Sequence, residues 1–211
     1  MQNFFLLEHP LALHKLSFLR DKNTSSAEFR GIFKEISKFL VYEASKDLKT
    51  RTIGIETPMA ATEVQRIIEP PVVVSIMRAG NGMLDAIMDV MPFASAGHIG
   101  IYRDKFIKNT VEYYFKLPDK VQGKLIFLVE PLIATGDTAI AAIERLKQYE
   151  VGEIRMLSIV AAKQGLEDIF HAHSDVKIYS LAVESKLDDK GYLIPGVGDA
   201  GDRLYNTKAW I

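Results

Sequence analysis

The chain has 211 residues, of which 48% are hydrophobic and 25% are charged, and its 26 basic residues are balanced by 27 acidic ones. This composition allows a sizeable buried core and argues against a disordered or fibrous protein, and the lack of a basic block argues against binding to nucleic acid. No cysteine is present, so a disulfide scaffold, a thiolate zinc site and a cysteine nucleophile are excluded. The sequence shows neither a secretory signal nor an apolar run of about 18 residues, and we therefore expect one cytoplasmic domain over residues 1–211 that does not bind membranes.

The first quarter of the chain predicts one long helix and one strand. Ser25 and Glu28 form a capping-box pattern, because a serine side chain and a glutamate three residues later can each accept a hydrogen bond from the other's backbone N–H. Apolar residues recur at helical spacing from Phe29 to Leu40 and predict an amphipathic helix, whose apolar stripe packs within the chain or between subunits. Alternation over residues 51–57 predicts a half-buried strand.

Strand and helix patterns then alternate through the centre of the chain. Three apolar runs suit central strands of a parallel sheet that is covered on both faces, namely residues 72–77, 125–129 and 156–162. Each run is followed by a helical pattern, over residues 83–91, 138–149 and 166–173 respectively. Such units in series predict an α/β fold with a doubly wound, mainly parallel sheet flanked by helices.

Two further segments lie outside this alternation. Residues 99–102 and 111–117 predict a β-hairpin that projects from the core. Residues 192–205 contain Pro195 and three glycines and predict a C-terminal loop region, and long loops in compact domains are often functional.

Unusual residues follow two of the predicted central strands, at the sheet edge where α/β proteins bind ligands. Arg78 comes directly after the first strand and is followed by glycines. After the second strand, Glu130 precedes a short loop that brings Thr135, Gly136 and Thr138 to a helix start. Backbone N–H groups and hydroxyls at that helix start could hold a phosphate, while the carboxylate could accept hydrogen bonds from sugar hydroxyls. An ordinary turn capped by a threonine explains the loop equally well.

Other well-known site motifs are absent from the sequence or incomplete. The chain contains no P-loop, no G-x-S-x-G nucleophile elbow and no H-E-x-x-H zinc motif. Gly80 and Gly82 follow a strand, but Asp85 stands where a dinucleotide-binding loop needs its third glycine. The sequence therefore excludes a P-loop kinase and gives little support to a dinucleotide-binding site.

Four stretches together resemble one known family. VEPLIATGDTAIAAI is similar to the loop of uracil phosphoribosyltransferases that binds 5-phospho-α-D-ribose 1-diphosphate (PRPP), and HPLALHKLSFLRDKNTS, SIMRAGNGM and GYLIPGVGDAGDRLYNTK resemble the same family in the same order. Departures are Glu130 for the usual Asp, Asp137 for Gly, Thr138 for Ser, and Ser75 for a common proline. The likeness extends over nearly the whole chain, and the tail separates this family from other phosphoribosyltransferases.

The resemblance implies a type I phosphoribosyltransferase fold and an enzyme that joins uracil to the ribose of PRPP, with UMP and diphosphate as products. It also implies Mg²⁺ bound mainly through the diphosphate, and a homodimer or larger homo-oligomer. Some family members are activated by GTP, and no residue here is assigned to that control. No protein side chains are expected to form a metal site of their own.

The family roles pass to matching residues of this sequence. Arg78, Arg103 and Asp199 are the candidate catalytic residues, although a solvated loop charge is the alternative for Arg103. The resemblance implies a PRPP site formed by Arg78, Arg103, Glu130, Pro131, Leu132, Ile133, Ala134, Thr135, Gly136, Asp137, Thr138 and Asp199. It implies a uracil site formed by Leu193, Gly198, Asp199 and Ala200. Backbone N–H and C=O groups of a glycine-rich loop can pair with the edge of uracil, whereas cytosine would leave these buried groups unpaired. Asp199 is also placed to meet Mg²⁺ or the ribose side of PRPP.

Several charged residues are expected to stay outside the chemistry. We expect Asp202 and Arg203 to pair with each other and hold the tail. Lys15, Arg20 and Lys22 are expected to be solvated surface charges. The side chain of Asp137 is expected to turn outward to solvent, because a phosphate at a helix start is gripped by backbone N–H groups that any residue supplies.

Two alternatives to a uracil enzyme remain. A carboxylate at Asp137 beside a dianionic phosphate would suit a chain that only senses nucleotides, such as a pyrimidine-operon regulator that binds RNA, although no basic stripe supports it. A purine phosphoribosyltransferase is the other, since such loops often begin with Glu-Asp. Pro131 after Glu130 argues against it.

Overall fold

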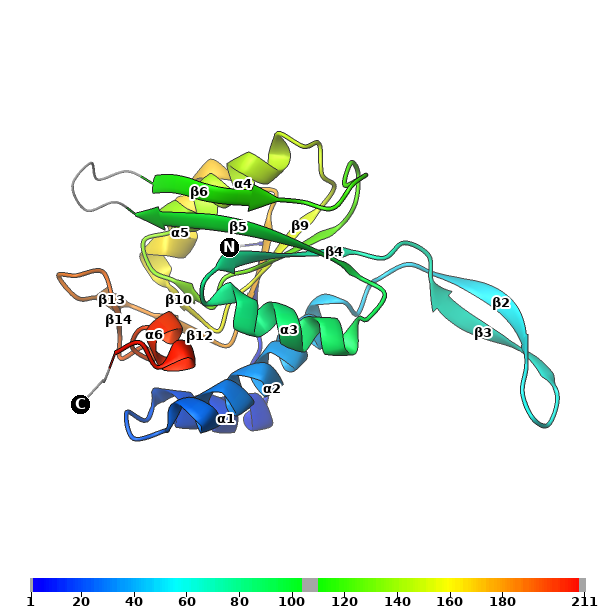
Figure 1. Cartoon of the computed structure of the whole chain (residues 1–211), viewed down its shortest axis with the longest axis horizontal. Coiled ribbons are helices and arrows are strands. Elements are labelled where there is room, and N and C mark those ends of the chain that lie inside the picture. Colours follow the sequence, from blue (N-terminus) through cyan, green and yellow to red (C-terminus); the bar gives the residue numbers. More distant parts are fainter. Residues whose placement is uncertain (1, 104–109, 209–211) are drawn as a thin grey trace.

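The computed structural model describes residues 2–103 and 110–208 (Figure 1). Its main sheet has seven strands in the order β1-β11-β9-β7-β4-β5-β6, and all neighbours are parallel except β5 and β6. In sheet order the strands are β1 (Phe4–Leu6), β11 (Lys177–Ser180), β9 (Ile154–Leu157), β7 (Ile126–Val129), β4 (Val72–Met77), β5 (Ser95–Arg103) and β6 (Thr110–Lys116). The predicted mainly parallel sheet is confirmed.

Helices cover both faces of this sheet (Figure 1). One face carries α1 (Pro10–Arg20), α2 (Ser26–Ala44) and α3 (Gly80–Val90), and the other carries α4 (Asp137–Lys147) and α5 (Lys163–Ala172). Successive residues of β4 point to opposite faces, so Val73 packs in the first core while Val72 and Val74 pack in the second. This division of one apolar strand between two cores is what the doubly wound prediction required.

Helix α2 begins as its sequence predicts. Ser25 is the N-cap, and its side chain and that of Glu28 form the complete capping box. Most of its apolar stripe is covered by the chain's own core: Phe29, Phe33 and Leu40 are each at most 1% exposed, while Ile32 and Phe39 are partly buried. The stripe therefore packs mainly within the chain.

The predicted strand over residues 156–162 is broken in two. Strand β9 ends at Leu157, and β10 (Val160–Ala162) joins a separate parallel sheet between β8 (Leu132–Ile133) and β12 (Ala182–Glu184). The break falls at Ser158, whose buried hydroxyl donates to the carbonyl oxygens of Pro131 (3.0 Å) and Val160 (3.1 Å). The chain thus turns at a polar residue whose hydroxyl is bound to one nearby carbonyl oxygen and one that is distant in sequence.

The described residues include two long hairpins, of which one was predicted. The predicted one consists of β5 and β6, which extend the main sheet at its edge. The other pairs β2 (Thr50–Glu56) with β3 (Ala61–Ile67) and stands clear of the body (Figure 1). Only its first strand was predicted, because β3 is mostly polar and exposed on both faces.

The C-terminal tail is more ordered than a loop prediction allows. Strand β14 (Leu193–Ile194) pairs antiparallel with β13 (Lys186–Leu187), and a short helix, α6 (Ala200–Tyr205), follows. Residues 195–199 remain irregular between them and are called the tail loop below. No helix in the described ranges is both long and apolar enough to cross a bilayer.

Candidate active site

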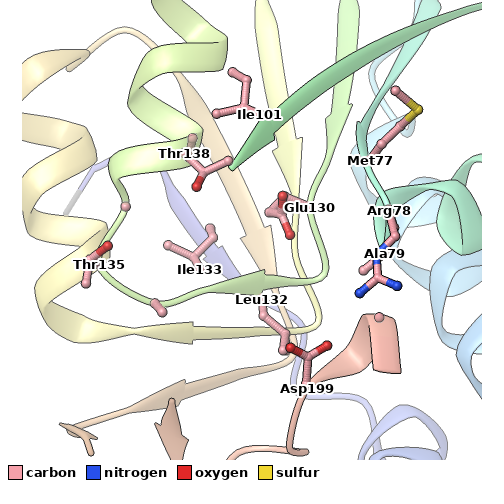
Figure 2. A pocket seen from close by; sticks show the side chains of 14 residues that line it. Met77, Arg78, Ala79, Ile101, Glu130, Leu132, Ile133, Thr135, Thr138 and Asp199 are labelled. Atoms are coloured by element: carbon pink, nitrogen blue, oxygen red, sulfur yellow. The ribbon is translucent and has the colours of Figure 1, made fainter. Parts of the chain in front are cut away.

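Two adjoining cavities lie at the carboxyl ends of β4 and β7. The first has a volume of about 250 Å³, and Figure 2 shows Arg78, Glu130 and Asp199 directed into it from three different elements. Its lining residues are Met77, Arg78, Ala79, Ile101, Glu130, Leu132, Ile133, Ala134, Thr135, Gly136, Thr138, Ala139, Asp199 and Gly201. Arg78 follows β4, Glu130 follows β7 and Asp199 precedes α6, so the strand-end loops and the tail meet here.

The second cavity, of about 230 Å³, lies on the tail side. It is lined by Ala79, Glu130, Pro131, Leu132, Ala134, Gly191, Tyr192, Leu193, Gly198, Asp199, Ala200 and Gly201. Glu130 and Asp199 line both cavities and so stand on their common wall. Two small compartments that share two carboxylates can hold two ligand groups side by side.

The loop before α4 presents backbone to the first cavity. Gly136 is the N-cap with φ 86°, and no side chain caps the helix, so a threonine-capped turn is wrong. A Cβ at Gly136 would stand 2.9 Å from the carbonyl oxygen of Gly165 at the start of α5, and the left-handed φ also favours glycine. The uncapped N–H groups of the first helical turn are a favourable place for an anion.

Asp137 does not point to solvent as expected. It is half-buried as the first residue of α4, and its carboxylate accepts a hydrogen bond from the Thr135 hydroxyl at 2.9 Å. Thr135 lines the first cavity while Asp137 does not. The carboxylate is therefore turned away from the cavity. It accepts the hydrogen bond of the Thr135 hydroxyl, a donor that would also suit a phosphate.

Glu130 occupies an environment that disfavours its charge. Burial raises the pKa of Glu130 to about 8, the backbone N–H of Leu132 opposes that rise, and the Asp199 carboxylate adds to it. A carboxyl with a pKa near neutrality in a cavity can bind as a hydrogen-bond donor or as an anion, depending on its neighbours.

The raised pKa predicts a pH-dependent stability. Between pH 4.5 and about 8 the folded chain keeps a proton on Glu130 that the unfolded chain releases, so the free energy of unfolding falls as the pH rises through this window. Glu130→Gln removes the carboxyl and should raise the free energy of unfolding at pH 9 by at least about 1 kcal/mol, or roughly 2–4 °C in Tm. The full shift is worth more, but water in the cavity screens the charge. Melting of both proteins without ligands at pH 5 and pH 9 checks this, and an equal difference at the two values would contradict it.

Arg78 is held on a loop that packs tightly against the neighbouring strand. A Cβ at Gly80 would stand 2.6 Å from the carbonyl oxygen of Val129 and 2.8 Å from the Ser75 hydroxyl, so α3 can begin here only with glycine. Ser75, which replaces the proline common in the family, is buried and donates to the side chain of Asn81 at 2.7 Å. The serine thus ties the strand to the first turn of α3.

The predicted pairing of Asp202 with Arg203 is wrong. Buried Asp202 lies 3.3 Å from the Arg78 guanidinium and 3.3 Å from Lys208, and it accepts from the Thr207 hydroxyl at 2.6 Å. The Thr207 hydrogen bond, together with Lys208 and Arg78, holds the pKa of Asp202 below its ordinary value against the effect of burial. Asp202 therefore links the tail to the arginine of the first cavity.

The predicted site residues are largely brought together. All lie on one of the two cavities except Asp137 and Arg103. Arg103 ends β5, and its side chain lies outside the described residues. Sequence reasoning missed Met77, Ala79, Ile101, Ala139, Gly191, Tyr192 and Gly201. A Cβ at Gly201 would stand 3.2 Å from the Asp199 carboxylate and 3.5 Å from Arg78, a closeness that only the structure reveals.

Known proteins match this chain over its length. The sequence model of the uracil phosphoribosyltransferase family matches residues 6–207. The uracil phosphoribosyltransferase of Rhizobium meliloti (strain 1021) is 45% identical over 210 residues, covering 99% of this chain and 100% of the relative. That of Brucella anthropi is 45% identical over 205 residues, covering 96% and 98%.

Solved structures agree with this assignment. The AQ2163 protein from Aquifex aeolicus superposes with a TM-score of 0.92 at 34% identity, covering 98% of this chain and 100% of that one. The adenine phosphoribosyltransferase of Trypanosoma brucei, 14% identical with a TM-score of 0.61 over 90% and 88% of the two chains, shares the fold. The type I phosphoribosyltransferase fold expected from the sequence is confirmed, and the chain belongs to the uracil phosphoribosyltransferase family.

Proposed function

We propose that this protein converts uracil and PRPP to UMP and diphosphate. The observation that carries the proposal is the pair of adjoining cavities, because the reaction needs two ligands whose reacting atoms meet at one wall. The bond from ribose C1 to the diphosphate oxygen breaks, and the diphosphate leaves with its electron pair. A bond forms from C1 to N1 of uracil, and the proton on N1 is released.

The first cavity suits PRPP. Its 5-phosphate would bind at the start of α4, which has no side-chain cap and where the positive end of the helix dipole stabilises an anion. Glu130 lines both cavities and would accept hydrogen bonds from the ribose hydroxyls at the wall toward the base. The Arg78 side chain is 56% exposed and borders this cavity, and its guanidinium would stabilise the negative charge that builds on the departing diphosphate.

The second cavity suits the base. Leu193 offers a buried apolar side chain, and Gly198 and Ala200 offer backbone close to the cavity. Uracil presents acceptor, donor and acceptor groups along one edge, and backbone groups matched to that pattern would be left unpaired by cytosine. We therefore expect strong preference for uracil.

Mg²⁺ is expected to enter with PRPP. Glu130 and Asp199 are near enough for one carboxylate to raise the pKa of the other, and such oxygen donors, completed by phosphate oxygens, suit this hard cation. Among the residues that the structure describes, no group of three or more acidic or histidine side chains could hold a metal alone. Bound mainly through the diphosphate, the ion would neutralise charge on the leaving group.

Asp137→Gly, which restores the usual family residue, should leave an active enzyme whose KM for PRPP changes less than about tenfold. The carboxylate is bound to Thr135 and turned from the cavity, so its removal frees one hydroxyl and removes little repulsion. Stability should fall by about 1 kcal/mol, because the helix loses an acid in its first turn and gains a freer backbone. Initial rates and urea unfolding measure both. Asp137→Asn is the control that removes charge alone, and a hundredfold gain in PRPP affinity would instead place Asp137 against the phosphate.

The proposal is tested by incubating the purified chain with PRPP, Mg²⁺ and one base at a time, and by measuring nucleotide and diphosphate. Uracil should give UMP, while cytosine, hypoxanthine and orotate give little or no product. A hypoxanthine product would favour a purine enzyme. No product with any base would favour a nucleotide sensor over a catalyst.

A further inference from the structure

Two arginines that line neither cavity donate hydrogen bonds to backbone carbonyls of the tail loop. Arg20 of α1 donates from Nη1 to the carbonyl oxygen of Gly196 at 2.9 Å. Arg203 of α6 donates from Nη1 to the carbonyl oxygen of Val197 at 2.9 Å. These two carbonyls directly precede Gly198 and Asp199, which face the base cavity.

Each arginine is anchored to the body of the protein. The other terminal nitrogen of Arg20 lies 2.7 Å from the carboxylate of Glu184, a buried residue at the end of β12. Arg203 is 7% exposed, lies over the ring of Phe29 at 4.2 Å, and donates to the carbonyl oxygens of Leu19 and Asp21 where α1 ends. Arg20 was expected to be a solvated charge, and that expectation is wrong, since it is tied to two distant segments.

These anchors set the direction of the loop's peptide groups. In a trans peptide the C=O and the next N–H point in opposite directions, so carbonyls 196 and 197 held toward the arginines turn the N–H groups of Val197 and Gly198 away from them. Hydrogen bonding within the described residues leaves the Gly198 N–H without a partner. That group is free to meet a ligand in the cavity that Gly198 lines.

The loop could not keep this orientation by itself. Gly196 has φ 56° and Gly198 has φ 74°, and glycines in this region reach many other conformations at small energetic cost. Only Val197 between them has a side chain buried in the core. External hydrogen bonds from charged donors are therefore what fixes the peptide planes.

We propose that Arg20 and Arg203 are positioning residues that set the affinity and selectivity for the base without touching it. The inference rests on the proposed function and deepens it. The ligand class is a planar pyrimidine that presents a carbonyl acceptor to the loop, as uracil does and the amino group of cytosine does not. The arginines hold the loop backbone in the conformation that presents the Gly198 N–H to this acceptor, so that the loop does not have to become ordered when the base binds.

Arg20→Gln is the main test, because the Arg20 side chain is 28% exposed, and a melting curve accompanies it because its partner Glu184 is buried. We expect the KM for uracil to rise about tenfold, with kcat at saturating uracil within about threefold and the KM for PRPP unchanged. The uracil-to-cytosine selectivity should fall with it. Arg20→Lys keeps one charged donor and should recover part of the loss.

Lys15→Met is the matched control, since Lys15 lies on the same helix and pairs with Glu35 at 2.7 Å without contacting the tail. Its kinetic constants should equal those of the wild type. Arg203→Lys repeats the test from the other carbonyl, with a melting curve to show that this buried site still folds. Should it not fold, the Arg20 pair of variants decides the question alone.

The outcomes separate the two proposals. A wild-type chain that forms no UMP overturns the proposed function and this inference with it. A wild-type chain that forms UMP, with an Arg20→Gln variant that keeps the wild-type KM for uracil, overturns this inference alone. An equal rise in both KM values would show a general structural role and would also overturn it.

Discussion

Arg78→Ala is expected to lower kcat by about a hundredfold or more, because it removes a positive charge aimed at the leaving diphosphate. The side chain is 56% exposed and its hydrogen bond in the described structure goes to Asp202, so the fold should survive. The KM for uracil should change little, since Arg78 borders the first cavity and not the second. Steady-state rates with varied PRPP and uracil, beside a melting curve, measure these effects.

Arg78→Lys serves as its control. A lysine keeps the positive charge but loses the planar fork that matches a phosphate, so kcat should fall between the wild-type and alanine values. Near-normal turnover of the alanine variant would show that Arg78 has no part in the reaction and that other groups stabilise the negative charge on the leaving diphosphate.

Gly198→Val is expected to abolish the use of uracil while the rest of the fold persists. Gly198 has φ 74° and lines the base cavity, so a β-branched side chain would strain the tail loop and enter the space of the base. UMP formation and circular dichroism provide the two measurements.

The matched control for this variant is Gly123→Val. Gly123 also has a positive φ, 69°, but a Cβ there meets no atom within 4 Å and the residue borders neither cavity of the site. It should cost stability through backbone strain and leave the kinetics unchanged. If Gly198→Val used uracil normally, the base would have to bind elsewhere.

Much of the fold follows from local patterns. Short stretches of sequence predict the capping box of α2, the apolar strands β4 and β7, and the helices that follow these strands. The structure confirms all of them. Strand β3 could not be found this way, because its polar residues stand in solvent and carry no burial pattern. The break at Ser158 was also invisible, since it depends on a hydrogen bond to Pro131 across the fold.

The candidate site divides in the same manner. Residues on contiguous strand-end loops, such as Glu130 and Thr135, are recognisable because the loop and the following helix start lie together in sequence. Whether that helix start was capped or open remained undecided until the structure showed an uncapped Gly136. The roles of Arg20 and Arg203 could not be predicted, because their loop and helix partners lie up to 184 residues away and no local pattern marks them.

If PRPP and uracil bind side by side in the two adjoining cavities, UMP and diphosphate should fill both cavities and the leaving-group position. In a crystal structure of the chain with these two products, we expect the 5′-phosphate at the first turn of α4, the uracil ring against Gly198, and diphosphate near Arg78. A nucleotide bound with its base at the start of α4, or bound away from Glu130 and Asp199, would show that the cavities do not hold the substrates in this way.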